Sequence, residues 1–406
     1  MMLVFGTRPD AIKMAPLLFA CQKNSQLETV VSVSAQHRQI LDDVLTHFNI
    51  TPDFDLNIMQ ESQTLTDITA RVLTGMDEIL TQSKPDVLLV HGDTTTGLSA
   101  GLSAFYHNIP IGHVEAGLRT GNPTSPYPEE MNRTLLGDLS TLHFAPTEQN
   151  RQNLLRQNVR GKIYVTGNTG IDVLRYTVRS DYRFSQPLLN QIDYSRRIIL
   201  LTTHRRENLD IGLPEIFAAV LRLVSAFPTT EVLFPVHPNP IVRNLARTAF
   251  ASNPRIHLLE PLNVLDMHNL ISRCYMVMTD SGGLQEEAPA LNKPVLVLRR
   301  ETERMEALNA GTVMLAGVRQ ESVFDCAALL LNDRQLYDKM ASATNPYGDG
   351  FASERIISAL IADFEGTSPP LENRLNNSLT NGPASGTKRT MHRRNSHLGD
   401  VAHGSI

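Results

Sequence analysis

The chain has 406 residues, a length that predicts two or three domains. Hydrophobic residues make up 41% of it, which is enough for a sizeable core and too many for a disordered protein. The net charge is −5, and no acidic or basic block dominates residues 1–365, which argues against nucleic acid or an anionic membrane as a partner.

The first part of the chain alternates short apolar runs with helical patterns. Residues 3–6 and 29–34 are predicted as strands, followed by helices at 11–23 and 36–48, with residues 7–10 expected as a turn. Further strands are predicted at 86–90 and 109–114. Short apolar strands that alternate with helices indicate a parallel sheet covered on both faces.

The second part repeats this alternation. Strands are predicted at 197–201, 231–235, 255–259, 276–279 and 294–298, and helices at 213–227 and 353–364. In between, residues 161–174 predict a strand and the start of a helix, and the polar stretch 179–196 predicts a linker. We therefore expect an α/β chain of two doubly wound domains, 1–170 and 171–365, with a cleft between them. The last helix is expected to pack near the boundary or to cross back to the first domain.

The last 41 residues, 366–406, differ in composition from the rest. Nine of them are hydrophobic and none is aromatic, so the segment cannot offset an ordering entropy of roughly 1–2 kcal/mol per residue. Five basic residues stand against two acidic ones. We expect a disordered, solvated tail rather than a segment that binds an acidic partner.

Cysteine content and apolar runs bear on the cellular compartment. Cys21, Cys274 and Cys326 are too few and too scattered for a disulfide framework or a cysteine zinc site. The apolar start is interrupted by Gly6 and Arg8, so it is too short for a signal peptide. No stretch approaches the ~20 apolar residues of a membrane span. We expect a soluble, cytoplasmic protein.

Ionisable side chains follow several of the predicted strands. Arg8, Asp93, Glu115 and His204 stand at such ends, and Glu129 follows a loop with two prolines. Ligands of open α/β sheets bind at the carboxyl ends of strands. A single aspartate there is often only a helix N-cap, but several acids with a histidine supply candidate general acids and bases. The pattern predicts an acid–base site.

A second pattern suits a phosphate group. The segment Thr-Asp-Ser-Gly-Gly at 279–283 follows an apolar strand and precedes a helix that is expected to start near Leu284. Backbone amides at a helix N-terminus, with glycines that permit close approach, favour an anionic oxygen. Arg8 is a candidate counter-charge. The alternative is a plain turn that uses glycine for its backbone angles.

Several common cofactor motifs are missing from the sequence. There is no G-x-x-x-x-G-K-[ST] run, no G-x-G-x-x-G after the first strand, and no H-E-x-x-H or C-x-x-C. A P-loop kinase, the usual dinucleotide site and a zinc centre therefore have little support. The D-x-D triplet at 53–55 is a weak signal of metal binding. We expect no cofactor and no metal.

Seven motifs follow one another in an order that is typical of one protein family. They occupy residues 5–9 (FGTRP), 91–96 (HGDTTT), 113–119 (HVEAGLR), 128–133 (PEEMNR), 203–208 (THRREN), 280–287 (DSGGLQEE) and 345–348 (NPYG). Over residues 2–364 the chain closely resembles the bacterial non-hydrolysing UDP-N-acetylglucosamine 2-epimerases. The resemblance implies two Rossmann-like domains in a glycosyltransferase-B arrangement and a homodimer. It also implies reversible interconversion of UDP-N-acetylglucosamine and UDP-N-acetylmannosamine without NAD or metal.

The resemblance further implies a mechanism and a set of site residues. UDP is eliminated across C1–C2 to give enzyme-held 2-acetamidoglucal, and re-addition returns a proton to the opposite face of C2. The catalytic set matched by motif position is Asp93, Glu115, Glu129 and His204, with the base and the acid unassigned. Substrate and UDP contacts are implied for Arg8, Lys13, Arg133, His237, Met267, Ser281, Gly282, Gly283 and Glu287. An allosteric site for UDP-N-acetylglucosamine is implied at Gln36, Gln39 and Arg205.

Three single positions and the segment 299–306 depart from the family pattern. Asp10 stands where glutamate is usual, Met267 where phenylalanine often lies beside the uracil, and Ser62 replaces an arginine, which weakens the prediction of an allosteric site. Three alternatives stay open: a hydrolysing epimerase that releases N-acetylmannosamine and UDP, a sugar transferase of the glycosyltransferase-B type, and a non-catalytic nucleotide-sugar sensor. A sensor leaves the carboxylates unexplained, because charge in a cleft is costly unless it is used.

Overall fold

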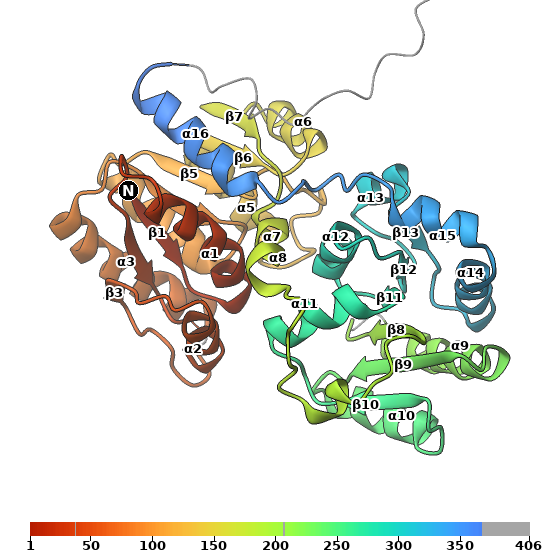
Figure 1. Cartoon of the computed structure of the whole chain (residues 1–406). Coiled ribbons are helices and arrows are strands. Elements are labelled where there is room, and N and C mark those ends of the chain that lie inside the picture. Colours follow the sequence, from red (N-terminus) through yellow and green to blue (C-terminus); the bar gives the residue numbers. More distant parts are fainter. Residues whose placement is uncertain (37, 206–207, 368–406) are drawn as a thin grey trace, which may run out of the picture. The chain divides into compact units, whose positions relative to one another are not determined.

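The computed structural model describes residues 1–36, 38–205 and 208–367 (Figure 1). The predicted disordered tail lies outside the described residues from position 368 onward. Within the described ranges, no helix combines the length and the apolar character needed to cross a membrane.

The first half of the chain forms a parallel sheet of seven strands in the order β3-β2-β1-β4-β5-β6-β7. The strands are β1 (Met2–Phe5), β2 (Val30–Val33), β3 (Phe54–Asp55), β4 (Leu88–His91), β5 (Ile111–Val114), β6 (Leu142–Ala145) and β7 (Lys162–Val165). The helices between them are α1 (Arg8–Gln22), α2 (Arg38–His47), α3 (Leu65–Ser83), α4 (Thr95–Tyr106), α5 (Glu129–Leu139) and α6 (Glu148–Arg156).

The second half forms a parallel sheet of six strands in the order β10-β9-β8-β11-β12-β13. The strands are β8 (Arg197–Thr202), β9 (Thr230–Pro235), β10 (Ile256–Leu259), β11 (Met276–Thr279), β12 (Val295–Val297) and β13 (Val313–Leu315). The helices are α9 (Gly212–Ala226), α10 (Pro240–Phe250), α11 (Val264–Arg273), α12 (Gly282–Ala290), α13 (Met305–Ala310), α14 (Gln320–Asn332) and α15 (Arg334–Ala341). Three strands, β3, β6 and β13, were not predicted from the sequence.

Short elements connect the two sheets. They are α7 (Thr169–Asp172), α8 (Leu174–Thr177) and the 3-10 helix η1 (Pro187–Asn190). The last helix, α16 (Ala352–Phe364, blue in Figure 1), packs against α1 and α7. The Asp172 carboxylate accepts hydrogen bonds from the backbone N–H groups of Ala352 at 3.0 Å and Ser353 at 2.6 Å, which would otherwise lack partners at the start of α16.

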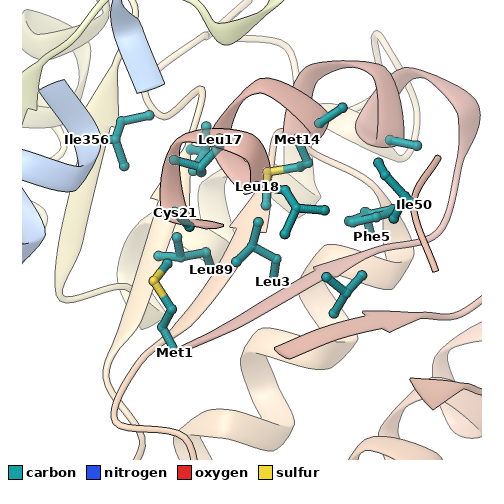
Figure 2. Packing of buried hydrophobic residues seen from close by; sticks show 14 of the residues in the cluster. Met1, Leu3, Phe5, Met14, Leu17, Leu18, Cys21, Ile50, Leu89 and Ile356 are labelled. Carbon is teal, nitrogen blue, oxygen red and sulfur yellow. The ribbon is translucent and has the colours of Figure 1, made fainter. Parts of the chain in front are cut away.

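A core of apolar side chains holds α1 onto the first sheet. Leu3 and Phe5 of β1 are buried together with Met14 and Leu17 of α1, and Ile356 of α16 joins the same cluster (Figure 2). Strands of a parallel sheet are covered on both faces, which is why β1, β4 and β5 are buried at every residue.

Both sheets share one topology. In the first sheet the strand order reverses direction between β1 and β4, and in the second sheet it reverses between β8 and β11. Ligands of doubly wound sheets bind outside the carboxyl ends of the strands at such a reversal. Four predicted site residues follow these strands: Arg8 at the start of α1, and Asp93, His204 and Ser281 in the loops after β4, β8 and β11.

One local prediction was wrong. Residues 7–10 are predicted as a turn, but α1 already begins at Arg8. Pro9 suits the first helical turn, because the N–H that it lacks has no helical partner there and its fixed φ matches the helix. The predicted turn is therefore helical, and Asp10 and Lys13 lie one turn apart on the same side of α1.

Candidate active site

Glu115 lies in a buried polar cluster at the carboxyl end of β5. Its backbone is in the left-handed region, with φ of +63°, so the chain turns sharply after the strand. Its Oε2 atom pairs with the Lys13 ammonium of α1 and accepts a hydrogen bond from Asn168 Nδ2 at 2.9 Å. Nε2 of His91, at the end of β4, lies 3.6 Å from the same oxygen. The structure thus brings together two predicted site residues, Glu115 and Lys13.

Glu115 and Lys13 each stabilise the charged form of the other. Burial raises the pKa of Glu115, but Lys13 and His91 outweigh burial and hold that pKa well below its ordinary value. Burial lowers the pKa of Lys13, whereas the Glu115 and Glu286 carboxylates raise it to about 12. Glu115 is therefore a carboxylate at neutral pH, and it can act first as a base.

Asp93 and Glu129 lie near the start of α5, where Arg133 pairs with Asp93 and with Glu130. Asp93 follows β4 and the left-handed Gly92, whose φ is +59°, and its carboxylate pairs with Arg133 of α5. Glu129 is the first residue of α5, four positions before Arg133, so the two residues share a face of the helix. Oε2 of Glu129 is buried and has no hydrogen-bond partner in the part of the chain that the structure describes. Buried carboxylate oxygens usually have a hydrogen-bond partner, so this free acceptor makes Glu129 a candidate for contact with a ligand.

His204 is positioned by a buried aspartate, Asp280, which follows β11. Nδ1 of His204 lies 3.1 Å from Asp280 Oδ1, and the His204 ring stacks on that of His237 with 5.5 Å between centroids. The Asp280 carboxylate also accepts hydrogen bonds from the backbone N–H groups of His204 and Arg205, the Thr203 hydroxyl and the Asn208 amide. Burial raises the pKa of Asp280, but these donors, with His204 foremost, bring it below its ordinary value.

The N-terminus of α12 has the features of an anion site. Ser281 is its N-cap residue, and its side chain makes no capping hydrogen bond. A Cβ atom on Gly282 would lie 2.8 Å from Nη2 of Arg304, so only glycine lets this guanidinium approach the helix start. A Cβ on Gly283 would lie 3.4 Å from Glu287 Oε1, an ordinary contact. Amides of the first helical turn beside a buried arginine favour a negatively charged ligand.

Asn168 links the acid cluster of the first sheet to α12. Its Nδ2 atom donates to Glu115 Oε2 at 2.9 Å and to Glu286 Oε2 at 2.8 Å. Nε of Arg304 in turn lies 3.1 Å from Glu286 Oε1. Burial raises the pKa of Glu286, opposed chiefly by Arg304. A continuous polar network therefore joins Glu115 to the start of α12.

Arg8 also reaches from α1 toward the second half. Its Nη2 atom lies 3.5 Å from the carbonyl oxygen of Leu262. Burial raises the pKa of Glu287 in α12, but His268, Lys13 and Arg8 together bring it below its ordinary value. Arg8, the predicted counter-charge for a phosphate, and Glu287, a predicted contact of the substrate or UDP, thus affect each other electrostatically.

The remaining predicted residues are more dispersed. Gln36 accepts a hydrogen bond from the Thr96 hydroxyl at 3.1 Å, Gln39 is exposed on α2, and Nε of Arg205 donates to the Asp280 carbonyl at 3.2 Å. Met267 packs against the apolar core of the second half. No hydrogen bond joins Gln36, Gln39 and Arg205 within residues 1–36, 38–205 and 208–367. The allosteric site stays a prediction.

Sequence reasoning missed four residues of this network. His91, Asp280 and Glu286 stand inside the family motifs, next to residues that were selected, and their types alone would have justified including them. Asn168 gave no such signal, because it matters through contacts between segments far apart in sequence.

The described residues contain cavities but no cluster of metal ligands. Among the residues that the structure describes, no group of three or more His, Cys, Asp or Glu side chains is arranged to hold a metal ion. In the D-x-D triplet, Asp55 pairs with Arg38. A cavity of 460 Å³ lies at the amino ends of the strands, lined by Met1, Val30 and Val87, away from the predicted chemistry. A smaller one of 220 Å³ is lined by Arg8 and Leu262, among other residues.

Comparisons with known proteins point in one direction. The family model described as UDP-N-acetylglucosamine 2-epimerase matches residues 19–361. The UDP-N-acetylglucosamine 2-epimerase of Bacillus subtilis strain 168 is 53% identical over 364 residues, covering 89% of this chain and 95% of that protein. Its Escherichia coli K12 counterpart is 49% identical over 365 residues, covering 88% and 97%.

A solved structure agrees with the sequence comparisons. The Neisseria meningitidis UDP-GlcNAc 2-epimerase bound to UDP-GlcNAc superposes with a TM-score of 0.81 at 44% identity, covering 89% of this chain and 99% of that one. The predicted fold class, α/β with two parallel doubly wound sheets, is confirmed.

Proposed function

The chain belongs to the UDP-N-acetylglucosamine 2-epimerase family, and we propose that it interconverts UDP-N-acetylglucosamine and UDP-N-acetylmannosamine without net hydrolysis. The observation that carries this proposal is the polar network from Glu115 through Asn168 to Glu286. It links a cluster of acid–base groups to a helix start that suits a diphosphate. An epimerase that acts by elimination needs both of these parts side by side.

The chemistry of the sugar explains why both parts are needed. The C2 hydrogen is not next to a ketone, so its direct removal is unfavourable. In an elimination, a base takes the C2 proton, its electron pair forms the C1=C2 bond, and the C1–O bond breaks to release UDP. Re-addition reverses these steps with the proton delivered to the other face of C2. The growing negative charge on the departing diphosphate must be stabilised throughout.

The residues divide between these two tasks. Asp93, Glu115, Glu129 and His204 are the proposed acid–base set, and the ionised state of Glu115 supports its use as a base. The diphosphate is assigned to Arg8 and to the start of α12 at Ser281, Gly282 and Gly283. Glu287 is assigned to the ribose, Met267 to the uracil, and Lys13, Arg133 and His237 to the sugar and phosphate groups around them.

Solvent exchange tests the proposal directly. Incubation with UDP-N-acetylglucosamine in heavy water should place deuterium on C2 of both epimers, as followed by NMR, with the total of the two nucleotide sugars constant. Folded protein that binds UDP but gives no deuterium at C2 would contradict the proposal. Net release of UDP with free N-acetylmannosamine would instead identify a hydrolysing epimerase.

We also propose that the chain forms a homodimer through α4 and α5. These helices pack against each other and expose four large apolar side chains: Phe105 (55% exposed), Tyr106 (64%), Met131 (45%) and Leu135 (42%). Neighbouring apolar side chains of this size at a surface are typical of protein contacts.

Light scattering tests the dimer. The wild type should have twice the chain mass, and Phe105→Glu with Tyr106→Glu should reduce the mass to that of one chain. Ile211→Glu changes an equally exposed apolar residue (71%) in the second half and should leave the dimer intact. A wild-type protein with the mass of a single chain would refute this part.

A further inference from the structure

His91 stands between two buried carboxylates. It is the last residue of β4, and 4% of its surface is exposed. Its Nε2 atom lies 3.6 Å from Glu115 Oε2, and its Nδ1 atom lies 3.9 Å from Asp10 Oδ1 in the first turn of α1. One ring nitrogen therefore faces the carboxyl group that follows β5, and the other faces the carboxyl group at the start of α1.

Two atoms of this group lack hydrogen bonds. Nε2 of His91 and Oδ2 of Asp10 are buried and unpartnered within the described part of the chain. Asp10 itself is 3% exposed. Leaving a buried polar atom unpaired is unfavourable, so such atoms are usually paired unless they have a role. Burial raises the pKa of Asp10 and hydrogen bonding by the Thr7 side chain and the Gly6 backbone opposes this, but its Oδ2 atom is left without a partner among the described residues. Both carboxylate oxygens of Asp172, by contrast, accept hydrogen bonds at the start of α16.

Several other charged or titratable groups surround the three residues. Lys13 comes from α1, Asp93 from the loop after β4, His113 from β5, and Glu286 and Arg304 from the second half. Lys13 is paired with Glu115, and Asp93 with Arg133. Burial raises the pKa of Asp10 to about 6, with His91 opposing this and Asp93 adding to it. Asp10 therefore exchanges its proton close to neutral pH, while Glu115 is ionised.

We propose that Asp10 and His91 form a proton relay behind Glu115, which removes the proton that Glu115 takes from the substrate and can return it. The proposal rests on the epimerase function proposed above. Asp10 and His91 are positioning residues in it, because they act through Glu115 and have no assigned contact with the substrate.

The relay conserves protons and charge. The Oε2–H bond of protonated Glu115 breaks as Nε2–H forms on His91. At the same time Nδ1–H of His91 breaks as Oδ1–H forms on Asp10. The imidazole is neutral before and after and only changes tautomer, while the negative charge moves from Asp10 to Glu115. Both gaps exceed hydrogen-bond length by about 1 Å, so a small side-chain shift closes them.

The first test measures turnover against pH. Asp10→Asn and His91→Gln should each lower kcat about 10-fold or more at pH 7, with KM and UDP affinity unchanged. In both variants the limb of the kcat profile near pH 6 should disappear, and Asp10→Glu, which keeps a carboxyl group, should retain it. Wild-type kcat and pH profile in Asp10→Asn would overturn the relay. So would a loss of UDP binding in parallel with kcat, since that indicates a structural role.

Asp172→Asn is the matched control. Asp172 is also a buried aspartate whose pKa burial raises, but it is fully engaged in holding α16. Its substitution should lower the unfolding temperature and leave the pH profile of kcat as in the wild type. The same change of profile in Asp172→Asn as in Asp10→Asn would count against the relay.

A second test needs no turnover, so it separates the relay from the proposed function. In protein labelled with 15N-histidine, the ring nitrogens of His91, identified by the His91→Gln variant, should switch tautomer as the pH passes through the pKa of Asp10, about 6, and Asp10 gains or loses its proton. The switch should be absent in Asp10→Asn. A wild-type His91 ring that keeps one tautomer through this range would overturn the relay. A wild type that shows the switch but no epimerisation would overturn only the proposed function.

Discussion

Each half of the molecule has a buried aspartate near the strands where the order of its sheet reverses, Asp10 in the first half and Asp280 in the second. The surroundings of these two residues shift their pKa values in opposite directions. In the second half, the Asp280 carboxylate accepts hydrogen bonds from Thr203, His204 and Arg205, and these donors bring its pKa below the ordinary value in spite of burial. In the first half, Oδ2 of Asp10 has no partner among the described residues, and burial raises its pKa to about 6.

The difference shows how one topology serves two tasks. The lowered pKa keeps Asp280 ionised, and its carboxylate joins His204 and Arg205 after β8 to the end of β11, beside the start of α12. Asp10, whose pKa is raised to about 6, can gain or lose a proton near neutral pH beside His91 and Glu115. The comparison suits the proposal that Asp280 positions its surroundings for ligand binding, whereas Asp10 takes part in proton transfer.

The strongest test of this division removes a carboxylate from the first half. Asp93→Asn should lower kcat at least about 100-fold, the usual scale for an acid–base group. UDP affinity, measured by calorimetry, should be unchanged, because the proposed diphosphate contacts lie mainly in α12. Asp86→Asn, an exposed aspartate at the opposite end of β4, is the control and should have full activity. Unchanged turnover in Asp93→Asn would remove this residue from the mechanism.

The two buried aspartates should affect stability with opposite signs. Asp10 has a pKa raised above that of the unfolded chain, so it destabilises the fold above about pH 6 and not below about pH 4. Asp10→Asn should therefore be more stable than the wild type at pH 8, by up to about 3 kcal/mol, and equal to it at pH 4.

Asp280 should show the reverse pattern. Its pKa is below that of the unfolded chain, so its stabilising effect is complete above about pH 4 and is lost as the pH falls through its folded value. Asp280→Asn should be less stable than the wild type at pH 7, with the gap narrowing in acid. Thermal unfolding of both variants from pH 3 to pH 8 measures this. If both variants were more stable than the wild type at pH 8, or both less stable, the contrast between Asp10 and Asp280 would be refuted.

A smaller effect is expected from the helix start. Gly282→Ala places a Cβ against the Arg304 guanidinium, 2.8 Å from Nη2, and should weaken UDP binding about 10-fold while kcat at saturation changes little. Gly283→Ala meets Glu287 only at 3.4 Å and should have a weaker effect. Equal affinity in Gly282→Ala and the wild type would place the diphosphate elsewhere.

The fold was largely predictable, because its signals are local. The alternation of apolar runs and helical patterns predicts the buried strands, since a parallel sheet needs apolar residues on both faces. The start of α1 was predicted wrongly, because proline was taken as a turn signal where it suits the first turn of a helix. Positions after the strands β1, β4, β5 and β8 identified Arg8, Asp93, Glu115 and His204 for the same local reason.

By itself, then, the sequence determined the two doubly wound sheets, the family and the loops that carry the site. The tertiary structure alone decided which of those residues are neighbours. No local pattern reveals that Asn168 reaches both Glu115 and Glu286, or that Asp10 and His91 are left with unpaired atoms. Such contacts join elements far apart in the chain, and the protonation of a buried acid depends on the partners that those contacts supply or withhold.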